Sequence, residues 1–228
     1  TTLAFVSNDE NGERDFVFSR GADRELKYDS SIKNKFKDNM VHFGAATALL
    51  GGNLEDAYSR YFFDALTQNS FISFDPNYRV DLWKGKDDTF IKKSMPFIEK
   101  SHLCKFSLDE ALLISKKDTL QSACEFFHDV GASILVVTLG GDGTYLSTKG
   151  FTTTIKSIKV NPVDTTGAGD AFIGCLLKQI ADLDSWENLH EKTKALSDMV
   201  ALANRAGAIT TTKFGAINAL PTQNQLLS

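Results

Sequence analysis

The sequence has few cysteines and no pattern typical of a disulfide scaffold or a metal site. Its three cysteines, Cys104, Cys124 and Cys175, are odd in number, form no CxxC pair and lie in apolar stretches. We therefore expect reduced, buried thiols in a cytoplasmic protein. None of the four histidines has the spacing of a metal-ligand pair such as HExxH, which argues against a zinc site.

Long hydrophobic runs and an excess of positive charge are also missing. No stretch approaches the roughly 18 apolar residues that span a membrane. The 25 Lys and Arg residues and 29 Asp and Glu residues give a net charge of −4 at pH 7, whereas nucleic acids and anionic membranes attract clustered Lys and Arg. No GxxxxGK[ST] motif occurs, so a Walker-type phosphate loop is excluded. We expect neither a nucleic-acid nor a membrane partner.

The patterns that are present indicate alternating strands and helices. The predicted strands are 40–43, 71–74, 102–105 and 133–139, and the predicted helices between them are 54–68, 88–99 and 119–130. Residues 133–139, SILVVTL, are apolar enough for a strand that is covered on both faces. Such alternation predicts an α/β fold with a mainly parallel sheet and helices on both faces.

The two ends of the chain depart from this alternation. Residues 3–7 and 14–20 are strand-like, and Asn11-Gly12 between them is a strong turn signal, so we predict a β-hairpin. After residue 139 the sequence predicts a meander with strands at 144–147 and 151–155. Two long helices are predicted to follow, at 168–180 and 186–206.

The segment 163–172, VDTTGAGDAF, carries the chemistry. It joins a polar loop to an apolar helix, and small residues at Gly167, Ala168 and Gly169 let the backbone approach a ligand closely. The first N–H groups of a helix have no intrahelical partner and form an anion site. These N–H groups would hold a transferred phosphoryl group, and Asp170 would accept the proton of the attacking hydroxyl.

Two other interpretations compete at this segment. Gly-Ala-Gly can be only a tight turn, with Asp170 complementing the helix dipole by about 0.3–1 kcal/mol. Alternatively, Gly167-x-Gly169 could begin a dinucleotide fingerprint, but position 172 is Phe rather than Gly, and the motif lies near the C-terminus. The sequence therefore lacks the fingerprint of a nucleotide-dependent dehydrogenase.

The segment DTTGAGDAF resembles the signature of the ribokinase-like, or PfkB, sugar kinases. Further matches follow the family's order at residues 1–14, 74–83, 105–110, 136–143, 203–208 and 213–216, and those at 1–14 and 74–83 are most similar to the bacterial fructokinase branch. The resemblance covers all 228 residues. It implies one ribokinase-like kinase domain with a three-layer α/β core at 38–228 and part of a small β-lid at about 1–25. The family's N-terminal portion has no counterpart here, so we expect the true protein to be longer.

The resemblance also implies residue roles on the phosphate side. Asp170 matches the catalytic base, and Gly167, Ala168 and Gly169 match the anion hole. Glu110 matches the family's NxxE region, which organises Mg²⁺, while Ser107 stands where many members have Asn and also has the spacing of a helix cap with Glu110. The matches to the ATP site are Thr138, Gly140, Gly143 and Asn204; strand, turn and helix packing is the alternative role for each.

The remaining implied sites bind a cation and the sugar. The positions that match a monovalent-cation (K⁺) site are Asp164, Thr166, Thr211 and Gly215, with a structural turn as the alternative. Asn77 and Arg79 follow a strand end, where α/β sheets usually bind ligands. Arg20 lies on the hairpin that corresponds to the lid. Arg79 can equally be a surface ion-pair residue.

The predicted activity is transfer of a phosphoryl group from MgATP to a primary hydroxyl, with fructose giving fructose 6-phosphate. Another sugar or sugar acid, such as 2-keto-3-deoxygluconate, is the alternative substrate. A non-catalytic sugar or nucleotide sensor is the alternative of a different class, and the intact GAGD segment argues against it. By resemblance, a homodimer would form through the lid.

Overall fold

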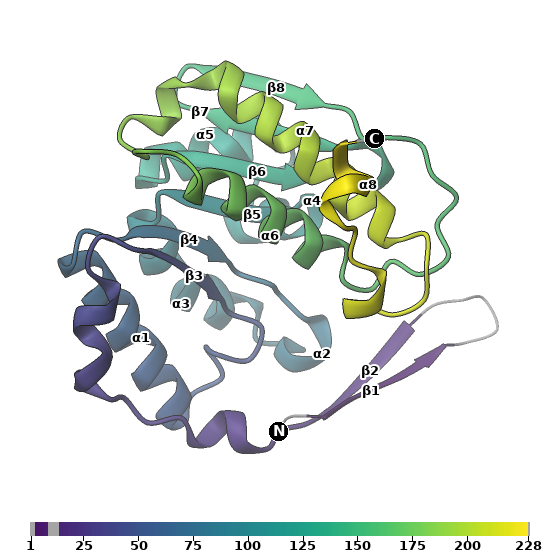
Figure 1. The fold of residues 1–228 in the computed structure, drawn as a ribbon. Coiled ribbons are helices and arrows are strands. Elements are labelled where there is room, and N and C mark those ends of the chain that lie inside the picture. The colour runs from purple at the N-terminus through teal and green to yellow at the C-terminus, as the bar shows by residue number, and fades with distance from the viewer. Residues whose placement is uncertain (1–2, 9–13, 228) are drawn as a thin grey trace. The chain divides into compact units, whose positions relative to one another are not determined.

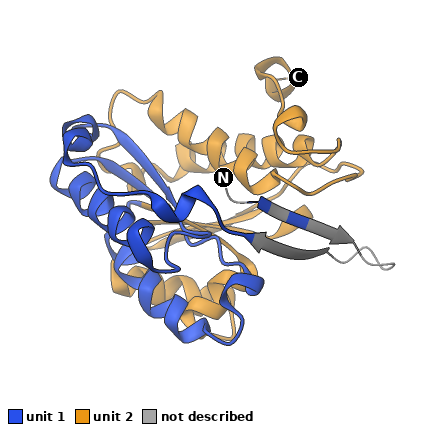
Figure 2. Ribbon diagram, turned by 90° about the horizontal axis from the view of Figure 1, so that it is seen from below, with its two compact units in different colours: residues 1–102 blue, residues 103–228 orange. Residues whose placement is uncertain are grey.

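The computed structural model describes residues 3–8 and 14–227 (Figure 1). The chain divides into two compact units, Thr1–His102 and Leu103–Ser228, which Figure 2 shows in blue and orange. Each unit is described by itself. No helix among the described residues is both long enough and apolar enough to cross a membrane.

The first unit begins with the predicted hairpin. Strands β1 (Leu3–Asn8) and β2 (Arg14–Ser19) pair antiparallel, with Leu3 opposite Ser19 and Asn8 opposite Arg14. The Asn-Gly turn that predicted the hairpin lies outside the described residues. Two short 3₁₀ helices follow, η1 (Ala22–Glu25) and η2 (Ser30–Phe36).

The rest of the first unit has the predicted strand and helix alternation. Strands β3 (Met40–Gly44) and β4 (Phe71–Asp75) pair in parallel, and every residue of β4 is buried. The helices are α1 (Gly52–Thr67), α2 (Val80–Trp83) and α3 (Asp87–Lys100). Aromatic side chains fill the core between strands and helices: Phe62 of α1 lies 5.1 Å from Phe43 and 4.7 Å from Phe97, measured between ring centroids. Such edge-to-face pairs add about 0.5–1.5 kcal/mol beyond their buried area.

The second unit contains four neighbouring strands of a sheet. Their order is β5 (Leu103–Ser107), β6 (Ile134–Thr138), β7 (Thr144–Thr148) and β8 (Phe151–Ile155). Strands β5 and β6 are parallel, while β6, β7 and β8 form the predicted antiparallel meander. Ile134 to Val137 are buried, which confirms that β6 is covered on both faces.

Helices cover both faces of this sheet (Figure 1). On one face lie α4 (Leu108–Ser115) and α5 (Leu120–Val130), and Phe106 of β5 stacks on Phe127 of α5 with ring centroids 4.5 Å apart. On the other face α6 (Ala168–Ala181) packs against α7 (Thr193–Thr210), which contacts β7 and β8. The chain ends in η5 (Ile217–Ala219) and α8 (Gln223–Leu227).

One predicted helix boundary is wrong. The sequence pattern placed the start of the last long helix at residue 186, but α7 begins at Thr193. Asn188 has φ +52°, a left-handed conformation that a helix cannot include, and η4 (Leu189–Glu191) follows it. Leu189 is buried, so its apolar side chain continued the helical pattern in the sequence although the backbone there is a turn.

Candidate functional site

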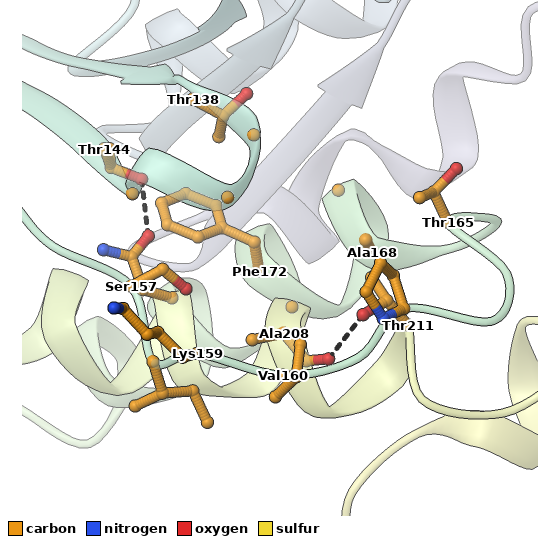
Figure 3. Close-up of a pocket in the computed structure, with 18 of the residues that line it drawn as sticks. Thr138, Thr144, Ser157, Lys159, Val160, Thr165, Ala168, Phe172, Ala208 and Thr211 are labelled. Atoms are coloured by element: carbon orange, nitrogen blue, oxygen red, sulfur yellow. Dashed lines mark hydrogen bonds between the residues drawn. The ribbon is translucent and has the colours of Figure 1, made fainter.

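The second unit contains a cavity of about 570 Å³, within the range of small-molecule sites. Figure 3 shows Thr138 and Thr144 on one side of it and Thr165 and Ala168 on another. Its walls come from the end of β6, the loop after it, a segment before α6, and the facing surfaces of α6 and α7. The lining residues are Thr138, Gly140, Gly141, Gly143, Thr144, 157–162, Thr165, Ala168, Gly169, Phe172, Asn204, Gly207, Ala208 and Thr211.

The loop after β6 forms one wall, and its glycines are needed for backbone reasons. The short helix η3 (Gly140–Asp142) closes the loop, and the N–H of Leu139 donates to the carbonyl of Gly143 at 2.8 Å. Gly143 has φ +109°, and a Cβ there would lie 2.1 Å from the carbonyl oxygen of Ile155. Only glycine therefore lets the end of β8 cross this loop so closely.

Asn204 of α7 joins this wall to the strands. Its Oδ1 accepts a hydrogen bond from the hydroxyl of Thr144 at 2.6 Å, and its Nδ2 donates to the carbonyl of Ile155 at 2.8 Å. Figure 3 draws the first of these bonds beside the cavity. Asn204 and Thr144 are both buried. The polar ends of Asn204 thus fasten α7 to β7 and β8 at the cavity wall.

The start of α6 forms the floor nearest to the predicted chemistry. Gly167, the N-cap, is left-handed with φ +80° and has no side chain to cap the helix. The N–H of Ala168 donates to the carbonyl of Thr165 at 3.3 Å. Of the three N–H groups expected to form the anion hole, that of Ala168 therefore already has an acceptor. The first N–H that bonds four residues back is that of Ala171, to Gly167 at 2.8 Å. Asp170 lies in the first turn with an exposed side chain.

The four residues of the expected cation site come together around two loops. The carboxylate of Asp164 accepts the N–H of Thr166 at 2.9 Å on one oxygen and that of Gly215 at 3.0 Å on the other. The carbonyl of Thr211 accepts the N–H groups of Val163 at 2.7 Å and Asp164 at 3.1 Å. These bonds hold the loop before α6 against the loop after α7.

Ser107 and Glu110 form the predicted capping box at the start of α4. The N–H of Glu110 donates to the hydroxyl of Ser107 at 3.2 Å, and the N–H of Ser107 donates to Oε2 of Glu110 at 2.8 Å. Ser107 does not line the cavity. In the part of the chain that the structure describes, no three His, Cys, Asp or Glu side chains gather as a metal site.

The three candidate sugar contacts lie in the first unit. Nε and Nη2 of Arg20 donate to Asp23 at 2.9 and 2.8 Å, so its guanidinium is held at the end of β2. Asn77 is left-handed with φ +50°, and its N–H donates to Asp75 at 3.0 Å. Arg79 is exposed, and its Nη1 donates to the carbonyl of Tyr78 at 3.0 Å.

Sequence reasoning missed two parts of the cavity. Residues 157–162 line it without regular secondary structure, so no periodicity marked them. Phe172 and Gly207 line it where α6 and α7 meet, and a Cβ on Gly207 would lie 3.1 Å from the carbonyl oxygen of Ala168. The small residues 206–208 at this crossing were the available signal.

Comparison with known proteins shows the family of the chain. The pfkB family of carbohydrate kinases matches residues 1–223. The chain belongs to this family. It is 34% identical over 232 residues to Probable fructokinase-4 of Arabidopsis thaliana, covering 100% of this chain and 70% of that protein. This kinase family therefore accounts for nearly the whole described sequence.

Solved structures extend the comparison to the fold. Fructokinase from Vibrio cholerae O395, solved with fructose, ADP and a calcium ion, is 27% identical with a TM-score of 0.85, covering 98% of this chain and 72% of that chain. A double mutant of that enzyme was solved with fructose, ADP and a potassium ion. Ribokinase from Thermotoga maritima, 21% identical, has a TM-score of 0.74 over 100% of this chain and 69% of that chain, and it shows the ribokinase-like α/β fold alone.

Proposed function

We propose that this chain carries the catalytic centre of an ATP-dependent sugar kinase whose substrate is fructose and whose product is fructose 6-phosphate. One observation carries the proposal: the exposed carboxylate of Asp170 lies in the first turn of α6, next to a nucleotide-sized cavity lined by Ala168 and Gly169. The fructokinase relatives, and the fructose and ADP found with one of them, support this choice of substrate class.

The proposed step is an in-line phosphoryl transfer. The primary hydroxyl oxygen of the sugar attacks the γ-phosphorus of ATP, and its proton passes to the carboxylate of Asp170. The bond from the γ-phosphorus to the bridging oxygen breaks, and that oxygen leaves with ADP. The backbone at Gly167, Ala168 and Gly169, together with the dipole of α6, would stabilise the charge on the phosphoryl oxygens.

The cavity supports a nucleotide role for four residues. Thr138, Gly140 and Gly143 form the loop that would enclose ATP, and Asn204 would act by holding that wall rather than through a free amide. Ser107 would act through the helix cap. Glu110 would help to hold Mg²⁺ through water and phosphate oxygens, where the ion would neutralise charge on the phosphates.

Three residues of the first unit remain proposed contacts to the sugar: Arg20, Asn77 and Arg79. Asp164, Thr166, Thr211 and Gly215 remain the proposed K⁺ site, supported by the potassium ion of the Vibrio enzyme. We propose a homodimer through the hairpin, because Leu3 and Phe5 share a face of β1 and are 53% and 58% exposed. The three free cysteines support a cytoplasmic location.

The test is ADP release from ATP and Mg²⁺ with a panel of fructose, glucose, ribose and 2-keto-3-deoxygluconate. Mass spectrometry and NMR of the product would identify the phosphorylated hydroxyl. We expect the highest kcat/KM with fructose and the phosphate at its 6-hydroxyl. A higher kcat/KM with the sugar acid would make that acid the substrate in place of fructose. Absence of ADP release with every sugar would favour the sensor.

A further inference from the structure

Lys105 of β5 is a buried cation that the proposed reaction has not yet used. Along β5, side chains alternate between the two faces of the sheet. Phe106 stacks on Phe127 of α5, so Lys105 points to the opposite face, which α6 covers. Its side chain is 8% exposed, and among the described residues it is the one buried lysine or arginine.

The amine of Lys105 lies at the N-terminus of α6. A methyl group on Gly169, the second residue of α6, would lie 3.5 Å from Nζ and 3.7 Å from Cε of Lys105. Gly169 also lines the cavity. The positive amine therefore lies beside the positive end of the helix dipole, and one anion can interact with both.

The space at Gly169 takes a group of methyl size, which corresponds to one oxygen atom of such an anion. Gly169 has no left-handed φ, and its missing Cβ would meet the lysine amine at ordinary contact distance, so neither the backbone nor packing requires glycine there. A glycine leaves this space open between the ammonium group and the first amides of α6. Charge-assisted hydrogen bonds from lysine to phosphate oxygens are short and strong.

We propose that Lys105 binds the non-bridging oxygens of the γ-phosphoryl group and neutralises the charge that develops on them during transfer. The proposal rests on the proposed kinase function and adds a positive side chain to the anion hole. Lys105 takes no proton in the step, because the hydroxyl proton passes to Asp170. It acts as a fixed charge, which is worth most in a site from which water is excluded.

The test compares Lys105→Met with Lys105→Arg and with Lys149→Met, which removes a charge from the exposed turn between β7 and β8. Calorimetric titration would give the dissociation constants of ATP, ADP and AMP for each variant. We expect Lys105→Met to weaken ATP about tenfold or more and AMP less than twofold, and to lower kcat about 100-fold. Lys105→Arg should restore part of both effects, and Lys149→Met should match the wild type.

Two results would overturn the proposal. Equal losses for ATP and AMP would indicate a structural role, and equal losses for ATP and ADP would put the amine on another phosphate. If wild-type protein releases ADP with none of the sugars, the kinase function fails. If wild-type protein does release ADP with a sugar but Lys105→Met binds all three nucleotides as the wild type does, only the role of Lys105 fails.

A second measurement needs no variant and covers the case in which Lys105→Met does not fold. Pyridoxal 5′-phosphate, an anionic aldehyde, would be reduced onto lysines of the wild-type protein with borohydride and located by mass spectrometry. We expect labelling of Lys105 that saturating ATP blocks and AMP does not. Labelling that ATP leaves unchanged, or no labelling of Lys105, would contradict the proposal.

Discussion

The two glycines at the start of α6, Gly167 and Gly169, differ in what a side chain would meet there. At Gly167 the backbone is left-handed, with φ +80°, and a Cβ would lie 2.8 Å from Cβ of Ala216. Gly169 has neither constraint, since its Cβ would meet only the amine of Lys105 at 3.5 Å. The first glycine is therefore required by the fold, whereas the second leaves space for a ligand.

This difference predicts opposite outcomes for two alanine substitutions. Gly167→Ala should lower the free energy of unfolding by at least about 1–2 kcal/mol, because alanine resists a left-handed backbone. Gly169→Ala should leave the free energy of unfolding unchanged or raise it by up to about 1 kcal/mol, because alanine is the better helix residue. The same substitution should lower kcat/KM about tenfold or more, because the methyl group occupies the space for the ligand. Urea denaturation and ADP release measure both; a fully active Gly169→Ala protein would refute a ligand at that position.

Two side-chain interactions, Arg20 with Asp23 and Ser107 with Glu110, differ in whether the sequence could predict them. The sequence placed Arg20 on the predicted hairpin, but its guanidinium is held by Asp23 in the 3₁₀ helix that follows. No strand or helix was predicted for residues 21–37, so no pattern in the sequence indicated this ion pair. In contrast, the spacing of Ser107 and Glu110 predicted the capping box that the structure has, because a cap depends on local sequence alone.

At the scale of elements, the cavity depends on how α7 is joined to the meander. Asn204 bonds to Thr144 at the start of β7 and to Ile155 at the end of β8. The strands β6 to β8 were predictable because they are short and apolar or alternating. The course of residues 157–162 was not, because it is set by tertiary contacts rather than by a repeating pattern.

Asn204→Ala should loosen this connection. It leaves the hydroxyl of Thr144 and the carbonyl of Ile155 without their partner, and a buried unsatisfied group costs about 1–3 kcal/mol. We expect a loss of about that size in the free energy of unfolding and a higher KM for ATP. Thr144→Val, which removes one of the two bonds, should cost less, and the double variant should cost less than the sum. Strict additivity would contradict a shared bond.

At the scale of the whole molecule, each unit contains a half-buried histidine whose pKa is lowered. Nδ1 of His102 accepts the N–H of Ile72 at 3.0 Å, and its ring stacks on Phe71. His128 lies between the carbonyl of Ala132 and the hydroxyl of Ser147, each at 2.8 Å. Burial is the main cause that lowers the pKa of both imidazoles.

These lowered pKa values predict how stability depends on pH. A free histidine has a pKa of about 6.5, so as the pH falls the unfolded chain takes up protons before the folded protein does. The stabilisation is complete above about pH 6.5 and is lost as the pH falls through the folded pKa values. Urea midpoints should therefore fall between pH 7 and pH 5.

The control for this pH effect is the partly exposed His190. His128→Gln should make the pH dependence of the urea midpoint shallower, because one of the two contributing imidazoles is gone. His190→Gln should leave it unchanged. A midpoint in the wild type that does not change between pH 7 and pH 5 would contradict the lowered pKa values of His102 and His128.

The motif at 164–172 allowed the family and the activity to be predicted from the sequence, because its residues are consecutive and the combination is rare. The division into two compact units was not predicted, since alternating strands and helices continue across residue 102. The amide of Ala168, expected to be open to phosphate, donates instead to Thr165. Such details depend on the loop's path, which the motif does not determine.

The central claim is that Asp170 accepts the proton of the sugar hydroxyl. The most direct measurement is the kcat of Asp170→Asn with fructose and MgATP, taken together with its dissociation constant for ATP. Since a general base contributes about 10²–10⁴ in rate, we predict at least a 100-fold lower kcat with ATP binding within about threefold of wild type. Wild-type turnover in Asp170→Asn would contradict the account.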